Sequence, residues 1–177
     1  MLENEGRAFL MYTIAGYAEG RRDALYEMLT HPLTVMGGSD AGAHLRFICD
    51  MSAQTFMLTD WVRDCAEGDR YHLPVEFVVK KQTQDTARLF GMYDRGTLEP
   101  GMKADLNLID LNALCIETPS MIHDLPAGMP RLMQTAQGYV ATVVNGEVVQ
   151  ENGKATGARP GKVVRGGQCA RQRQVAA

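Results

Sequence analysis

The feature that most constrains the fold is a short apolar stretch, residues 33–36, which runs directly into Gly37 and Gly38. One acidic residue, Asp40, follows these glycines, and His44 comes four positions later. A strand that ends in a carboxylate on a glycine-rich turn is how an α/β enzyme presents a general base to its substrate. Taken alone, an Asp in such a place more often caps a turn or the following helix. The stretch therefore predicts an α/β fold and makes Asp40 the first candidate site residue.

The residues before this stretch extend the α/β pattern. Residues 9–13 are an apolar segment between glycines, which is typical of a buried strand. Residues 18–29 place leucine and methionine side chains on one helical face, and Pro32 ends this helix. Strand, helix and strand joined by short links predict a parallel pair of strands covered by a helix.

The middle of the chain is predicted to be helical. Apolar side chains between Met57 and Cys65 recur at helical spacing and form one stripe. Pro74 stands where the first residue of a further helix is expected. Asp85 is expected to cap a short last helix, which Gly91 ends.

After Gly96 the pattern changes to turns and short strands. Residues 104–110 alternate apolar and polar side chains, as in a half-buried strand. Asn145-Gly146 lies between two β-rich runs and is a strong hairpin signal, and Asn152-Gly153 is a second one. Residues 112–137 contain prolines and little periodicity, so we expect a loop there.

Composition excludes several classes of function. A formal net charge of -3 over 177 residues gives no electrostatic reason to expect a nucleic-acid or membrane partner. No apolar run approaches the ~20 residues that span a bilayer, and the N-terminal residues lack the apolar core of a secretory signal. Four scattered cysteines without CxxC spacing are typical of reduced thiols. We therefore expect a cytoplasmic protein.

Several blocks of the sequence resemble one enzyme family, the metal-dependent amidohydrolases, and within it the N-acyl-D-amino-acid deacylase (D-aminoacylase-like) branch. The run from Thr30 to His44 resembles the last barrel strand of that family, and residues 89–106 resemble its return from barrel to small β-sandwich. Three further blocks are similar to the C-terminal part of the deacylase branch: residues 123–128, 140–146 and 157–161. The blocks stand in the family's order and together cover roughly residues 5–167, which makes them more specific than any single motif.

The resemblance implies an α/β fold built from the last β/α units of a (β/α)8 barrel followed by strands of a small β-sandwich. The incomplete barrel is expected in residues 1–95, the sandwich strands with a long intervening loop in 96–167, and a disordered tail in 168–177. The family's His-x-His pair, bridging Cys and further His ligands have no counterpart in the sequence. We therefore expect a fragment, a truncated gene product or one piece of a split protein.

The resemblance also implies a chemistry, the hydrolysis of carbon–nitrogen bonds in non-peptide amides. The expected reaction is N-acyl-D-amino-acid deacylation through a zinc-activated water, with Asp40 as general base and acid and as a weak, secondary metal ligand. Ser39, His44 and Arg46 are expected to bind the substrate. His44 could instead hydrogen-bond to Asp40, and Arg46 could be a solvated arginine. Because the main zinc ligands are absent from the sequence, this chain alone is expected to be inactive.

Two other functions stay open at this point. One is a different amidohydrolase activity, such as that of a cyclic-amide hydrolase or a deaminase, and the other is a non-catalytic piece that serves only in assembly or interaction. The expected partners are a small N-acyl amino acid or amide, and an N-terminal barrel chain or a second copy. His123 and Asp124 could pass for a metal pair, but in this context they are expected to lock a loop on the barrel surface.

Overall fold

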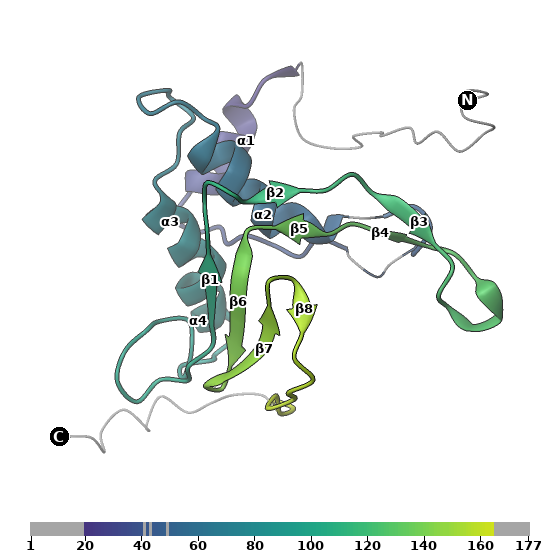
Figure 1. Ribbon diagram of the computed structural model, residues 1–177. Helices are drawn as coiled ribbons and strands as arrows, with labels where there is room; N and C mark the ends of the chain where they lie inside the picture. The colour runs from purple at the N-terminus through teal and green to yellow at the C-terminus, as the bar shows by residue number, and fades with distance from the viewer. Residues whose placement is uncertain (1–19, 41, 43, 49, 165–177) are drawn as a thin grey trace. The chain divides into compact units, whose positions relative to one another are not determined.

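A computed structural model describes residues 20–40, 42, 44–48 and 50–164 of the chain (Figure 1). The chain forms two compact units, Met1–Thr34 and Val35–Ala177. The described part of the first unit contains one helix, α1 (Asp23–Thr30). Asp23 lies in its first turn, where a carboxylate stabilises the helix dipole. His31 leaves the helix with extended backbone because it precedes proline. The predicted helix is thus confirmed, with a later start.

The predicted strand at residues 33–36 does not form. The backbone from Thr34 to Asp40 has no regular secondary structure, and the side chain of Leu33 is 88% exposed. A run of four residues becomes a strand only when a neighbouring strand supplies its hydrogen bonds, and no described strand pairs with it. The strand predicted at 9–13 lies outside the described residues.

The second unit begins its regular structure with η3 (Asp50–Ser52) and α2 (Ala53–Leu58), which continues into the π-helical turn η4 (Thr59–Arg63). The predicted apolar stripe lies on this segment, where Leu58, Trp61 and Val62 are buried. Trp61 is only 2% exposed. The helix predicted from this stripe is therefore confirmed.

A second continuous helical segment runs through α3 (Val75–Lys80), the π-helical turn η5 (Lys81–Asp85) and α4 (Thr86–Leu89). It begins directly after Pro74, as predicted. Asp85 does not cap a separate helix, because its backbone is itself helical and its carboxylate pairs with Lys80 at 2.6 Å. The end at Gly91 is confirmed: this residue has φ +69°, and the N–H of Met92 donates to the carbonyl of Ala87 at 2.8 Å, as in a Schellman motif.

One antiparallel sheet has the strand order β1-β6-β7-β8 (Figure 1). Its strands are β1 (Leu106–Ile109), β6 (Tyr139–Val144), β7 (Glu147–Glu151) and β8 (Lys154–Ala155). Both predicted hairpin turns are confirmed. Asn145 and Gly146 have φ +52° and +83°, and Asn152 and Gly153 have φ +47° and +75°, which fits the left-handed residues of type I′ turns.

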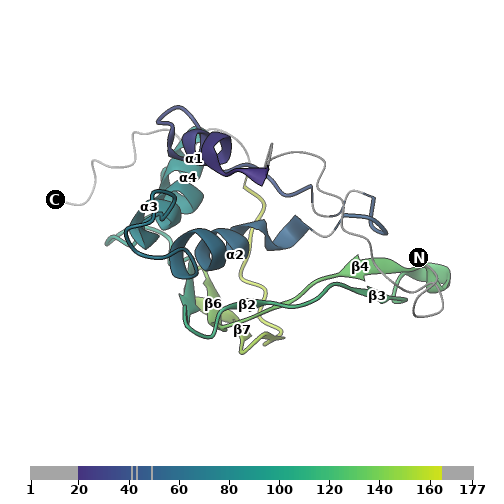
Figure 2. The ribbon, with the colours of Figure 1, turned by 90° about the horizontal axis from the view of Figure 1, so that it is seen from above.

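The segment predicted as a loop, residues 112–137, instead forms a two-stranded ribbon. It contains β2 (Cys115–Ile116) paired with β5 (Ala136–Gln137), and β3 (Ser120–Ile122) paired with β4 (Arg131–Met133), with η6 (Pro126–Gly128) at the tip. Figures 1 and 2 show the two pairs following one another along the ribbon. The three prolines lie between the short strands or at the tip, so they interrupt the ladder without preventing it.

The core of the second unit lies where α2, η4 and α3 meet the strand connections. Leu73, Val78 and Leu114 are at most 2% exposed, and the N–H of Leu73 donates to the carbonyl of Trp61 at 2.9 Å. Gly138 allows the closest backbone approach, because a Cβ at this residue would lie 2.5 Å from Cα of Leu114. Figure 2 shows α2 and α3 on one side of β6 and β7. No described helix has the length and apolar character that a membrane crossing requires.

Candidate functional site

The candidate site residues lie on one loop of the second unit, which two non-glycine residues bend. Asp40 has φ +53° and His44 has φ +44°. The left-handed region is costly for most side chains, but Asp and His adopt it several-fold more often than the average residue. Gly42, between them, has φ +91°. The candidate residue Asp40 thus itself adopts the left-handed backbone.

The far end of this loop is tied to the β3–β4 ribbon. The carbonyl of His44 accepts hydrogen bonds from Phe47 N–H at 2.7 Å and Ile48 N–H at 3.3 Å, which closes one turn. The carbonyl of Leu45 accepts a bond from the N–H of Leu132, in β4, at 2.7 Å. Sequence reasoning missed this role of Leu132, because no local signal marks a backbone bond between segments so far apart.

The four predicted site side chains are accessible. Asp40, His44 and Arg46 are exposed and Ser39 is half-buried. Within the described ranges, none of these side chains forms a hydrogen bond or ion pair, so Asp40 and His44 share a loop without bonding to each other. A Cβ at Gly37, Gly38 or Gly42 would meet no described atom within 4 Å. These three glycines are therefore not packed against any part of the chain that the structure describes.

The described residues do not form a metal centre. In the part of the chain that the structure describes, no three His, Cys, Asp or Glu side chains come together as ligands, whereas a zinc site takes at least three protein ligands. His31 uses Nδ1 locally, as the acceptor of the Leu33 N–H at 3.2 Å. Asp40 could give a metal one oxygen, but the described residues around it do not complete a site.

The paired residues His123 and Asp124 lock the tip of the β3–β4 ribbon, as predicted for a loop. Arg131 donates two hydrogen bonds to the Asp124 carboxylate, both at 2.7 Å, and His123 Nδ1 lies 3.2 Å from the carbonyl of Gly128. The hydrogen bond from Arg131 lowers the pKa of the Asp124 carboxyl below its ordinary value. These contacts give both residues a structural role at the tip of the ribbon.

Comparison with known proteins places the chain in a family. Residues 8–150 match the Amidohydrolase family, and the chain belongs to it. Members of this family generally use metal ions.

Among the relatives of this chain are one uncharacterised protein and two with named activities. The chain is 33% identical to an uncharacterised protein of Mycobacterium tuberculosis, over 79% of this chain and 23% of that protein. It is 32% identical to an N-acyl-D-aspartate deacylase of Alcaligenes xylosoxydans xylosoxydans, over 77% of this chain and 25% of the deacylase. It is 31% identical to a dihydroorotase of Elusimicrobium minutum, over 47% of this chain and 22% of the dihydroorotase. The chain thus spans about a quarter of the length of these relatives, and no solved structure matches it.

Proposed function

We propose that the protein to which this chain belongs hydrolyses the amide bond of an N-acyl-D-amino acid. Family membership supports the hydrolysis of a carbon–nitrogen bond. The relative named as an N-acyl-D-aspartate deacylase matches 77% of the chain, whereas those named as a dihydroorotase and a 5-methylthioadenosine/S-adenosylhomocysteine deaminase match 47% and 48%. The longer match favours deacylation over a cyclic-amide hydrolase or a deaminase.

The observation that carries the proposal is the exposed carboxylate of Asp40, on left-handed backbone, which bonds to no partner among the residues that the structure describes. A carboxylate that holds no cap and no ion pair is open to a water molecule. Asp40 would accept a proton from the water that attacks the amide carbon, and would then donate it to the departing amine. The same group thereby serves both halves of the hydrolysis.

The neighbouring side chains suit the rest of such a substrate. The guanidinium of Arg46 is exposed and matches the carboxylate of an N-acyl amino acid in planar, two-point geometry. His44 follows Asp40 by four residues and Ser39 directly precedes it, so both can donate to substrate oxygens. We assign these three residues to substrate binding and Asp40 to proton transfer.

We propose zinc as the metal of the whole enzyme, with ligands other than the described residues. A bound metal ion polarises the scissile carbonyl and makes its water more acidic. The described residues do not fit a complete zinc site, so their contribution is the proton transfer and the substrate contacts. For the same reason we propose that this chain alone is inactive.

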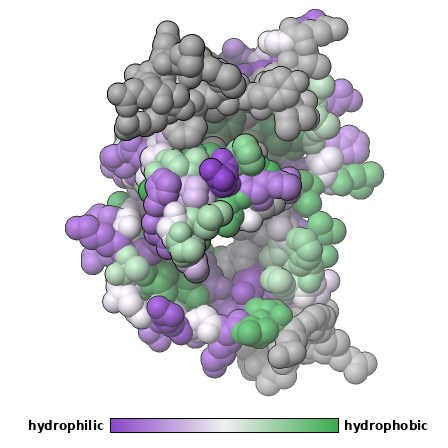
Figure 3. All heavy atoms as spheres, turned by 90° about the vertical axis from the view of Figure 1, so that its right-hand side faces the viewer, coloured by the Kyte–Doolittle hydropathy of each residue, from purple (hydrophilic) through white to green (hydrophobic). Residues whose placement is uncertain are grey.

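Open surfaces of the sheet support association with an N-terminal barrel chain or with a second copy. The outer edge of β1 is unpaired among the described strands. Leu106, Val143 and Val148 are register partners on one face, where Leu106 is 37% and Val148 43% exposed. Figure 3 shows apolar residues at the surface among polar ones. Such edges and patches are typical of contact sites. We further propose a cytoplasmic location, which the scattered positions of the four cysteines, without CxxC spacing, support.

A chimera tests the proposed reaction. This chain replaces the matching part of the Alcaligenes N-acyl-D-aspartate deacylase, and zinc content and circular dichroism establish that the chimera folds. We expect release of D-aspartate from N-acetyl-D-aspartate and slower release of L-aspartate from N-acetyl-L-aspartate. We expect no opening of the dihydroorotate ring. If this chimera does not fold, a second chimera carries only residues 33–46 of this chain in the Alcaligenes enzyme. A folded, zinc-loaded chimera that opens dihydroorotate but leaves both N-acetyl substrates intact contradicts the proposal.

A further inference from the structure

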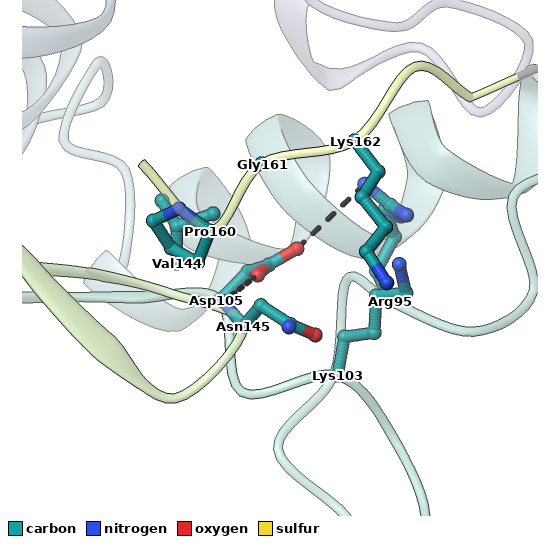
Figure 4. A pocket seen from close by; sticks show the side chains of 8 residues that line it. All are labelled: Arg95, Lys103, Asp105, Val144, Asn145, Pro160, Gly161 and Lys162. Carbon is teal, nitrogen blue, oxygen red and sulfur yellow. Dashed lines mark hydrogen bonds and ion pairs between the residues drawn. The ribbon is translucent and has the colours of Figure 1, made fainter. Parts of the chain in front are cut away.

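A pocket of about 260 Å³ lies away from the Asp40 loop, at the β6–β7 turn (Figure 4). Its walls come from the segment before β1, from the turn itself and from residues 160–162. Four charged side chains line it, namely Arg95, Lys103, Asp105 and Lys162. Figure 4 shows the three basic side chains on the side of the pocket opposite Val144 and Pro160. The pocket thus gathers three positive charges and one negative charge.

The two nearby carboxylates are already engaged in holding the pocket together. Nε of Arg95 donates to Asp94 at 3.0 Å, and this hydrogen bond raises the pKa of the Arg95 guanidinium. Arg95 also lies 3.6 Å from the Asp105 carboxylate. The other oxygen of Asp105 accepts the N–H of Asn145 at 2.7 Å. Arg95 and Asp105 therefore fix the wall of the pocket.

The two lysines are engaged less closely than Arg95 and Asp105, and they are the groups that can bind a ligand. The ammonium of Lys103 lies 3.6 Å from Asp94, a carboxylate that it shares with Arg95. Lys162 is exposed and forms no ion pair within the described ranges. Counted over the described residues, three cations lie near two carboxylates, Asp94 and Asp105, an excess of one positive charge.

We infer that this pocket binds a small phosphate group, either as inorganic phosphate or as a phosphate monoester. Lysine binds phosphate as a mobile point charge, and the positive charge in excess attracts an anion to the pocket. The volume lies below the roughly 300–1,000 Å³ typical of sites for drug-sized ligands, so one phosphate group fits the space better than a nucleotide. Bound phosphate bridges the segment before β1 to residues 160–162.

Titration of the whole chain with sodium phosphate, against sodium chloride at equal ionic strength, tests this inference. We expect inorganic phosphate to raise the melting temperature above the chloride reference, because a ligand that binds only the folded state stabilises it. Amide NMR shifts should report binding at Gly161 and Asn145. Methyl phosphate distinguishes the two sources, since a monoester site binds it at least as tightly as inorganic phosphate.

Variants of the lysines decide the location. Lys162→Gln breaks no described ion pair and should weaken phosphate binding about tenfold, as expected for a charge-assisted hydrogen bond. Lys103→Gln/Lys162→Gln should abolish the difference between phosphate and chloride. Lys154→Gln, on β8 and outside the pocket lining, is the matched control and should bind phosphate normally. Equal responses to both salts, or equal losses in Lys154→Gln and Lys162→Gln, overturn the inference. The test does not depend on Asp40 or on hydrolysis.

Discussion

Replacing Gly138 with alanine should destabilise the second unit strongly, because two separate costs meet at this residue. Its φ of +93° is a conformation that costs an L-residue about 1–2 kcal/mol. The added Cβ would also lie 2.5 Å from Cα and 2.7 Å from N of Leu114. Both are backbone atoms of a residue that is 1% exposed, so relief requires a backbone shift, at about 1–3 kcal/mol for overpacking. The expected loss is therefore about 2–5 kcal/mol in the free energy of unfolding, relative to a typical total of about 5–15 kcal/mol.

Urea denaturation followed by fluorescence measures this loss, because Trp61 is the single tryptophan and is 2% exposed. Gly157→Ala is the matched control. Gly157 has nearly the same φ, +92°, but a Cβ there would meet nothing within 4 Å. The control should lose only the backbone cost of about 1–2 kcal/mol. Equal losses in the two variants would refute the claim that the approach to Leu114 requires glycine.

Three further variants test other parts of the fold. Gly96→Ala should destabilise the protein less than Gly138→Ala, because the atoms nearest to its Cβ would lie at 2.9–3.0 Å (the Ala87 side chain and the backbone of Gln84 and Thr83) rather than at 2.5 Å, and equal urea midpoints would contradict this. Ala127→Gly should raise the unfolding free energy by roughly 0.5 kcal/mol, since φ +59° favours glycine, and a lowered urea midpoint would argue against strain there. Asp124→Asn should remove the part of the pH dependence of the unfolding free energy that comes from this carboxylate. The folded pKa of Asp124 lies below its ordinary 3.8, so its stabilisation is present above pH 3.8 and is lost as the pH falls through the folded value. Unfolding midpoints at pH 7 and pH 3 measure this, and an unchanged difference in the variant would contradict it.

Features that depend on neighbouring residues could be predicted from the sequence. The Asn145-Gly146 turn and the stop at Gly91 follow from the left-handed conformations that these residues adopt at little cost. The helix through Trp61 follows from apolar spacing, because one face of it is buried. In each case the signal and the structure that it specifies lie within a few residues.

Features that depend on distant partners could not be predicted. The ribbon of β2 to β5 carries no clear alternation, because most of its side chains are exposed or half-buried on both faces. Its place is set by the bond from Leu132 to Leu45 and by Ser52, whose hydroxyl donates to Gln134 at 2.7 Å. The predicted strand at 33–36 failed for the complementary reason, since its pattern allowed a strand but no described partner pairs with it.

In the candidate site too, the residues could be named from the local sequence, whereas their backbone conformation and long-range contacts could not. Residue types and their order along residues 37–46 were enough to name Asp40, Ser39, His44 and Arg46, and the family comparison covers this segment. The left-handed backbone at Asp40 and His44 and the anchor to Leu132 are visible only in the structure. The roles of these four side chains in binding and proton transfer stay predictions.

The central claim is that Asp40 moves the proton during amide hydrolysis, and the turnover number of the zinc-loaded chimera tests it most directly. Asp40→Asn keeps the size of the side chain but removes the base, so kcat should fall about 10²–10⁴-fold while zinc content stays the same. Glu99→Gln, a change at an exposed carboxylate outside the loop, serves as control and should leave kcat unchanged. An Asp40→Asn chimera that binds zinc normally and turns over as fast as the Glu99→Gln control would contradict the account.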